Sequence, residues 1–142
     1  MKPCPEMTKI VTAIATKHSI DLQQVGANIR LDMPGFDRLC IERIGPRCLS
    51  VAHYFEMNGD LMAEPDIVFF VESIGIWFPI SISQSLTGWR EYAKLNDAGT
   101  ALARYHPQAQ KGLAEFVEMW AQNIRDQQWL EEGVRYVYAR GG

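Results

Sequence analysis

A chain of 142 residues with 47% hydrophobic and 22% charged residues has the composition of one folded globular domain, which excludes a disordered or fibrous protein. Its net charge of −3 argues against direct nucleic-acid binding, because proteins of that class carry surplus Lys and Arg for phosphates. No run approaches the ~20 apolar residues of a membrane span, and the N-terminus lacks a hydrophobic signal core. We therefore expect a cytoplasmic protein without a membrane partner.

The first predicted element is a short helix. Met7, Ile10, Val11 and Ile14 recur at the i, i+3, i+4, i+7 spacing that lines one side of a helix, which predicts a helix over residues 7–18.

Strands are expected through the middle of the chain. Ile29, Leu31 and Met33 alternate with polar neighbours, which is typical of a strand with one wet face. The connections are too short for helical crossovers, so the sheet should be antiparallel. The other predicted strands cover residues 39–44, 47–56, 66–72 and 76–83, and residues 57–65 are expected to form a connection rich in turn formers.

Two details of this sheet follow from its turns and prolines. If Gly45-Pro46 forms a tight hairpin turn, Cys40 pairs with Val51 and Cys48 pairs with Arg43. Pro79 has no N–H to donate, so its strand should lie at an edge of the sheet or contain a bulge.

The second half is predicted to end in a long amphipathic helix. Residues 89–95 and 100–105 form either a hairpin or, in the first segment, a helical turn. A stripe of apolar residues then predicts a helix over 107–128, and alternation of Val134, Tyr136 and Tyr138 predicts a last short strand or a docked extension. The whole is one α+β domain: an antiparallel sheet of about five to six strands, with the two helices packed on it.

The cysteines give no sign of a disulfide or a zinc site. Cys4, Cys40 and Cys48 are odd in number and show no C-x-x-C spacing, so we expect reduced and mostly buried thiols.

Charge is distributed unevenly, and the middle third is acidic. No Lys or Arg occurs between Arg47 and Arg90. Acidic residues concentrate in that gap, and four of them are candidate partner-binding residues: Glu56, Asp60, Glu64 and Asp66. Trp77 and Trp89 are predicted as further interface residues, because aromatic side chains often anchor protein interfaces. Trp120 lies on the helix stripe and is expected in the core.

An alternative interpretation of the same region is a metal site. His53, Asp60, Glu64 and Asp66 would supply the ligands of a hard divalent metal if the loop folded back. The spacing matches no metal motif, and His53 is better explained as a partly buried histidine with a backbone or carboxylate partner. No phosphate-binding glycine loop or nucleophile elbow occurs, so no cofactor and no catalytic residue are predicted.

The segment from Ser50 to Phe69, SVAHYFEMNGDLMAEPDIVF, followed by Trp77-Phe-Pro-Ile-Ser81, resembles a family of uncharacterised small proteins of phages, plasmids and integrative elements. The resemblance covers roughly residues 28–128. It implies a strand core, a helical C-terminus and a mobile-element context, and it transfers no catalytic residue.

Three hypotheses about function remain open. The leading one is a non-enzymatic accessory protein of a mobile element that binds a host or defence-system protein, with inhibition through the acidic surface. The alternative is a metal-dependent hydrolase or nuclease that uses His53, Asp60, Glu64 and Asp66. The third is a homodimer that pairs through the strand containing Pro79.

Overall fold

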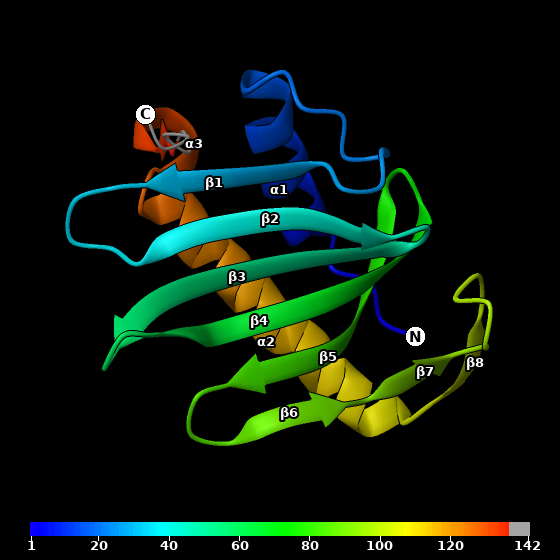
Figure 1. Ribbon diagram of the computed structural model, residues 1–142. Helices are drawn as coiled ribbons and strands as arrows, with labels where there is room; N and C mark the ends of the chain where they lie inside the picture. Colours follow the sequence, from blue (N-terminus) through cyan, green and yellow to red (C-terminus); the bar gives the residue numbers. More distant parts are fainter. Residues whose placement is uncertain (137–142) are drawn as a thin grey trace.

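The computed structural model describes residues 1–136, and it confirms the predicted α+β architecture (Figure 1). The helices are α1 (Pro5–Lys17), α2 (Pro107–Asp126) and the short α3 (Trp129–Glu132). The strands are β1 (Asn28–Asp32), β2 (Arg38–Gly45), β3 (Cys48–Met57), β4 (Asp60–Ser73), β5 (Ile76–Gln84), β6 (Gly88–Glu91), β7 (Ala93–Leu95), β8 (Leu102–Tyr105) and β9 (Val134–Arg135). The predicted strand at the C-terminus is thus present as β9, and Tyr138 lies outside the described residues.

Within residues 1–136, seven strands form one antiparallel sheet in the order β6-β5-β4-β3-β2-β1-β9, slightly more strands than predicted. β7 and β8 form a separate two-stranded hairpin around residues 96–101. The predicted hairpin of residues 89–95 and 100–105 is thus confirmed for residues 93–95 and 102–105. No helix in this part of the chain is both long and apolar enough to cross a bilayer.

The prediction of a connection over residues 57–65 is wrong, because β4 already begins at Asp60. Asn58 and Gly59 alone make the turn, with φ values of 54° and 85°. Two consecutive residues with positive φ are typical of a two-residue hairpin loop whose twist matches that of its strands. The residues that follow therefore pair with β3, and the hairpin extends well beyond the predicted strand ends.

The predicted pairing is off by one residue for Cys40 and by two residues for Cys48. Cys40 pairs with Ala52 and Cys48 pairs with Gly45, because the turn is made by Pro46 and Arg47 and the register shifts again between Arg43 and Gly45. The three cysteines are free, as predicted; Cys4 is buried, and the other two are half-buried.

Pro79 lies in an interior strand, so its placement at an edge is wrong. β5 is paired on one side with β4 and on the other with β6. The alternative of a bulge is confirmed, since the register shifts between Val68 and Phe69, opposite Pro79. β6 pairs with Ser81–Gln84, so this part of the strand has no free edge, and a dimer that pairs through β5 stays a prediction.

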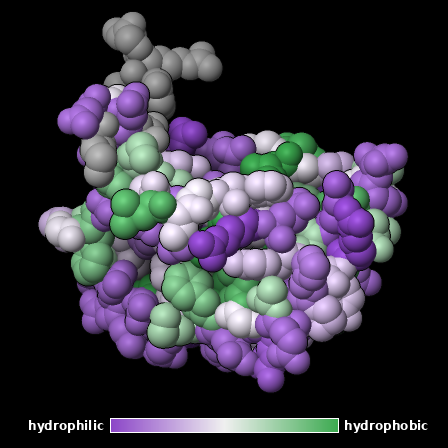
Figure 2. Space-filling view, turned by 90° about the horizontal axis from the view of Figure 1, so that it is seen from below, coloured by the Kyte–Doolittle hydropathy of each residue, from purple (hydrophilic) through white to green (hydrophobic). Residues whose placement is uncertain are grey.

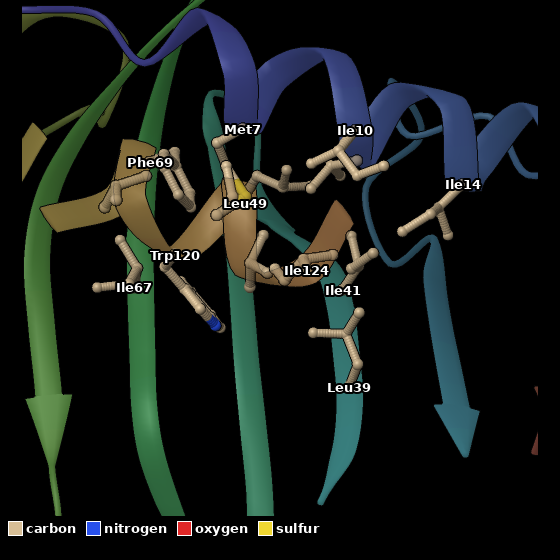
Figure 3. Packing of buried hydrophobic residues seen from close by; sticks show 14 of the residues in the cluster. Met7, Ile10, Ile14, Leu39, Ile41, Leu49, Ile67, Phe69, Trp120 and Ile124 are labelled. Carbon is tan, nitrogen blue, oxygen red and sulfur yellow. The ribbon is translucent and has the colours of Figure 1, made fainter. Parts of the chain in front are cut away.

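The two long helices cover one face of the sheet and enclose the core (Figure 1). Figure 3 shows Met7, Ile10 and Ile14 of α1 beside Ile41 and Leu49 of the strands, with side chains of α2 in the same layer. Trp120 of α2 belongs to this cluster at 7% exposure, as predicted. The helix stripes and the alternate residues of each strand thus bury their apolar sides against each other.

A smaller cluster lies at one end of the sheet. Phe70 of β4 packs with Ile80 and Ala93, and Leu95 and Leu102 of the β7–β8 hairpin pack against them. Phe70 follows a core residue, Phe69, and so lies on the face away from the helices. The hairpin therefore covers this end of the second face and leaves the other end, over β1–β4, open.

The N-terminus of α1 is capped by a residue that is distant in sequence. The side chain of Cys4 at the N-cap makes no capping hydrogen bond to the helix, but Glu118 Oε2 of α2 accepts the backbone N–H of Glu6 at 3.0 Å. Among the described residues, the buried Oε1 of Glu118 has no partner. Burial raises the pKa of this carboxyl above its ordinary value, and the neighbouring Glu6 adds to the effect.

Replacing Glu118 by glutamine should change how stability depends on pH. Because burial favours the uncharged carboxyl, wild-type protein has this stabilisation below the ordinary Glu pKa of about 4.3 and loses it as the pH rises through the raised value. The glutamine side chain keeps an acceptor for the N–H of Glu6 and cannot ionise. Urea unfolding should show wild type losing stability relative to the variant between about pH 4 and pH 7. A difference that is constant over this range contradicts the prediction.

Candidate binding groove on the open face of the sheet

The face of β1–β4 that is turned away from the helices contains a groove of about 990 Å³. Alternation along the strands creates its lining: Ile29 and Leu31 of β1 enter the core, so Asn28, Arg30 and Asp32 lie on the opposite face. Those three residues line the groove together with Phe36, Asp37, Arg38, Cys40, Ile41, Glu42, Ile44, Ser50, Tyr54, Phe55, Glu56, Asp66, Val68 and Tyr136.

Small side chains on the two middle strands account for the hollow. Cys40 of β2 pairs with Ala52 of β3, and the next pair on the same face is Glu42 with Ser50. Ala52 is fully buried and Ser50 is nearly so.

Asp66 is held by two hydroxyl groups at the β4 side of the groove. Ser50 Oγ donates to Asp66 Oδ1 at 2.6 Å, and the Tyr54 hydroxyl donates to Oδ2 at 3.3 Å. Burial and the charge of Asp66 raise the pKa of Tyr54 to about 12. Tyr54 therefore stays protonated near neutral pH and fixes the orientation of the carboxylate.

Replacing Asp66 by asparagine should lower the pKa of Tyr54 from about 12 towards its ordinary value, because the charge and the acceptor that favour the protonated phenol are lost. Burial remains, so the fall should be partial. NMR titration of the tyrosine ring signals measures it, with Tyr54→Phe assigning the signal. An unchanged Tyr54 titration in the Asp66 variant would show that the two side chains do not interact.

The opposite side of the groove is closed by a paired arginine. Arg38 donates to both carboxylate oxygens of Asp32, at 2.8 and 3.1 Å, and its guanidinium carbon lies 3.6 Å from the centre of the Tyr136 ring. The hydrogen bonds to Asp32 raise the pKa of Arg38 further. Asp32 and Arg38 therefore neutralise each other, and the charge balance of the groove is set by the remaining residues.

The groove is acidic overall. Among the described residues that line it, five carboxylates stand against two guanidinium groups. With Asp32 and Arg38 paired, the remaining carboxylates are Asp37, Glu42, Glu56 and Asp66, and the remaining cation is Arg30. An uncompensated acidic concavity attracts a cationic ligand or partner.

The predicted acidic residues are only partly brought together. Glu56 and Asp66 line the groove. Glu64 lies outside its lining and accepts hydrogen bonds from Ser85 and Gln84. The bonds from Ser85 lower the pKa of Glu64, so it remains ionised. Asp60 is exposed at the tip of the β3–β4 hairpin.

The four residues of the alternative metal site do not converge. His53 is turned to the helix side, where its ring lies 5.6 Å from that of Trp120 and 5.5 Å from that of Trp129. Its Nδ1 lies 3.0 Å from the backbone oxygen of Asp37, as expected for a partly buried histidine, and burial lowers its pKa. Over residues 1–136 no three His, Cys, Asp or Glu side chains are grouped closely enough to hold a metal ion.

Of the two predicted interface tryptophans, Trp77 is buried and Trp89 is exposed. Trp77 is 5% exposed and packs against Phe69 in the core, so its prediction as a surface residue is wrong. Trp89 is 62% exposed. The register pairs Asp66 with Ser83 and Ser83 with Trp89, which places Trp89 on the same face as Asp66. Figure 2 views the molecule from the β6 side and shows hydrophobic side chains as small patches among hydrophilic ones.

Several groove residues were missed by the sequence analysis. They come from β1, β2, β3 and the residue after β9: Arg30, Asp32, Arg38, Glu42, Ser50, Tyr54 and Tyr136. The signal that would have found most of them is the alternation of the strands themselves, since each polar residue between two core residues lies on the open face.

Comparison with known proteins places this fold in a family without an assigned function. Residues 9–130 match the model of a domain of unknown function, DUF6908. No curated protein and no solved structure matches the chain. The match includes α2 and all the strands that form the groove except the terminal β9. Because the family model covers most of the length of the chain, the chain belongs to the DUF6908 family.

Proposed function

We propose that this protein is a non-enzymatic binding protein that takes a protein partner on the open face of its sheet. The observation that carries the proposal is the acidic groove of about 990 Å³ on a face that no helix covers. The resemblance to small proteins of mobile elements supports a finer form of the proposal, in which the partner belongs to the host or its defence system and is inhibited.

The chemistry of the groove favours binding over catalysis. Burial raises the pKa of the Cys40 thiol, although Arg30 and Arg38 oppose the effect, so the reactive thiolate is disfavoured. The Tyr54 hydroxyl, with its pKa raised to about 12, is a poor base or nucleophile at neutral pH. No histidine occurs among the described residues that line the groove.

The surroundings of the groove are suited to a protein interface. Phe36 and Ile44 line it with exposures of 45% and 47%, and Trp89 lies on the same face beyond β5. Stable interfaces bury about 800 Å² on each partner and combine a few apolar or aromatic anchors with a charged surround. The groove, its apolar rim and Trp89 supply both parts.

Capture of a partner by matched charge variants tests the proposal. Tagged wild-type protein, a groove variant (Glu42→Lys with Glu56→Lys) and a control (Glu131→Lys with Glu132→Lys) are each used to capture proteins from a lysate of the source cells. The control changes two exposed acids of α3 by the same charge. A protein retained by wild type and control and lost by the groove variant supports the proposal. Equal capture by the groove variant overturns the role of the acidic face.

A further inference from the structure

We infer that the open half of the groove receives an arginine side chain of the partner, with its guanidinium group between Glu42 and Asp66 above Ser50. This inference rests on the proposed function and names the chemistry that the groove recognises. It follows from the position of the two carboxylates, from their unused hydrogen-bonding capacity and from the shape of the hollow between them.

Glu42 and Asp66 stand on opposite sides of a short side chain. Glu42 of β2 pairs directly with Ser50 of β3, and Ser50 donates to Asp66 of β4. Asp66 itself pairs with Ala52, two residues from Ser50 along β3, so the two acidic residues lie diagonally across three strands. Two strand spacings of ~4.8 Å and two residues of ~3.4 Å along the strand put their backbones roughly 12 Å apart. The small Ser50 between them leaves this gap within the groove of about 990 Å³, which is room for a planar cation.

Both carboxylates have capacity for new hydrogen bonds. Within residues 1–136, the side chain of Glu42 has no hydrogen-bond or ion-pair partner. Asp66 accepts one bond on each oxygen, from Ser50 and from Tyr54. An ionised carboxylate accepts about four hydrogen bonds, so each oxygen of Asp66 has about one acceptor site left. One free site on each of two oxygens matches the two parallel N–H groups of a guanidinium.

No cation of this protein fills the gap, as far as residues 1–136 show. Arg38 is held by Asp32 on the far side of the groove, and Arg30 pairs across the sheet with Cys40, on the other side of β2 from Asp66. The net charge between Glu42 and Asp66 is therefore negative, and the complementary group has to come from the partner.

Arginine fits the gap better than lysine. The fork of a guanidinium can bond both oxygens of a fixed carboxylate, whereas an ammonium group acts as a point charge. Arg38 already shows this mode in the same groove, with a two-bond contact to Asp32 and its plane against Tyr136. The ring of Tyr54, beside Asp66, offers the partner's arginine a comparable aromatic surface.

NMR titration with short peptides tests this inference without the partner. The probes are acetyl-Gly-Arg-Gly-amide, its Lys counterpart and its Glu counterpart, added to ¹⁵N-labelled wild-type protein, to Asp66→Asn and to Glu42→Gln. Asp97→Asn serves as the control, since Asp97 is exposed in the β7–β8 turn. The Arg peptide should give saturable shifts at residues of β2–β4, with binding at least tenfold weaker in both groove variants and unchanged in the control. The Lys peptide should bind several times more weakly than the Arg peptide, and the Glu peptide should not bind.

The inference is overturned if the Arg peptide gives no saturable shifts, or if Asp66→Asn binds it as well as wild type does. Amide spectra of the variants show whether each one is folded. Failure here leaves the proposed function standing if Glu42→Lys with Glu56→Lys still loses the captured partner. Retained capture by that variant, together with normal binding of the Arg peptide, would instead refute the proposed function alone.

Discussion

Replacing Trp129 by alanine should lower the free energy of unfolding by about 3–5 kcal/mol, the usual cost of removing a fully buried large aromatic side chain. Trp129 has no exposed surface, its ring lies 5.9 Å from that of Phe36 and 5.5 Å from that of His53, and its Nε1 donates to Gln127. The loss is a large share of the roughly 5–15 kcal/mol that stabilises a domain. Urea unfolding measures it. Trp89→Ala removes the same side chain from the surface and should change stability by less than about 1 kcal/mol.

Trp129→Ala should also change the titration of His53. Burial beneath the two tryptophans lowers the His53 pKa, so the folded state favours the neutral ring. Wild-type protein should therefore lose stability as the pH falls below the ordinary His pKa of about 6.5. Without the Trp129 ring, water reaches the imidazole and its pKa should rise, which NMR measures directly. A loss below about 1 kcal/mol together with an unchanged His53 pKa would contradict this description of the core.

Replacing Trp89 by alanine should weaken partner binding by about 30-fold or more, equivalent to about 2 kcal/mol, the scale of an aromatic hot spot. Trp89 is 62% exposed and lies on the face that carries the groove, so a partner seated over Asp66 and Ser83 would cover it. Titration calorimetry with the captured partner measures the effect.

Tyr105→Ala is the control for Trp89, because Tyr105 is 43% exposed in β8 of the separate hairpin. Its removal should change the affinity less than threefold. Equal losses in the two variants, or an unchanged affinity in Trp89→Ala, would place the interface elsewhere.

The fold was largely predictable because local patterns decided it. Alternation of Ile29 and Leu31 with polar residues fixed which side of β1 enters the core, and the apolar stripe of the second helix fixed α2 within two residues of its predicted end. Short connections then left antiparallel pairing as the only arrangement.

Bulges explain the largest errors, because Pro79 indicated a bulge only as one alternative and did not show which side chains it would move to the other face. Strict alternation would put Trp77 and Ile82 on opposite faces of β5, yet both lie in the main core, because the register shifts between them. Phe78 and Ile80 consequently pack in the smaller cluster instead. A bulge exchanges the faces of every following residue, so one shift moved Trp77 from a predicted surface into the interior.

The candidate site was only partly predictable for a related reason. The acidic gap in the sequence identified Glu56 and Asp66, but closeness in sequence did not show which acids share a face. Glu64 is two residues from Asp66 and lies outside the groove lining, whereas Glu42 and Asp66 are joined through Ser50 across three strands. Contacts between strands depend on register, which charge composition does not contain.

Carboxyl labelling of the protein, free and with its captured partner bound, tests the central claim most directly. A water-soluble carbodiimide with glycine ethyl ester modifies accessible carboxylates, and mass spectrometry locates them. The account predicts that the partner protects Glu42, Glu56 and Asp66 and leaves Asp97 and Glu131 as reactive as in the free protein. Protection of Glu131 with full reactivity of the three groove residues would contradict it.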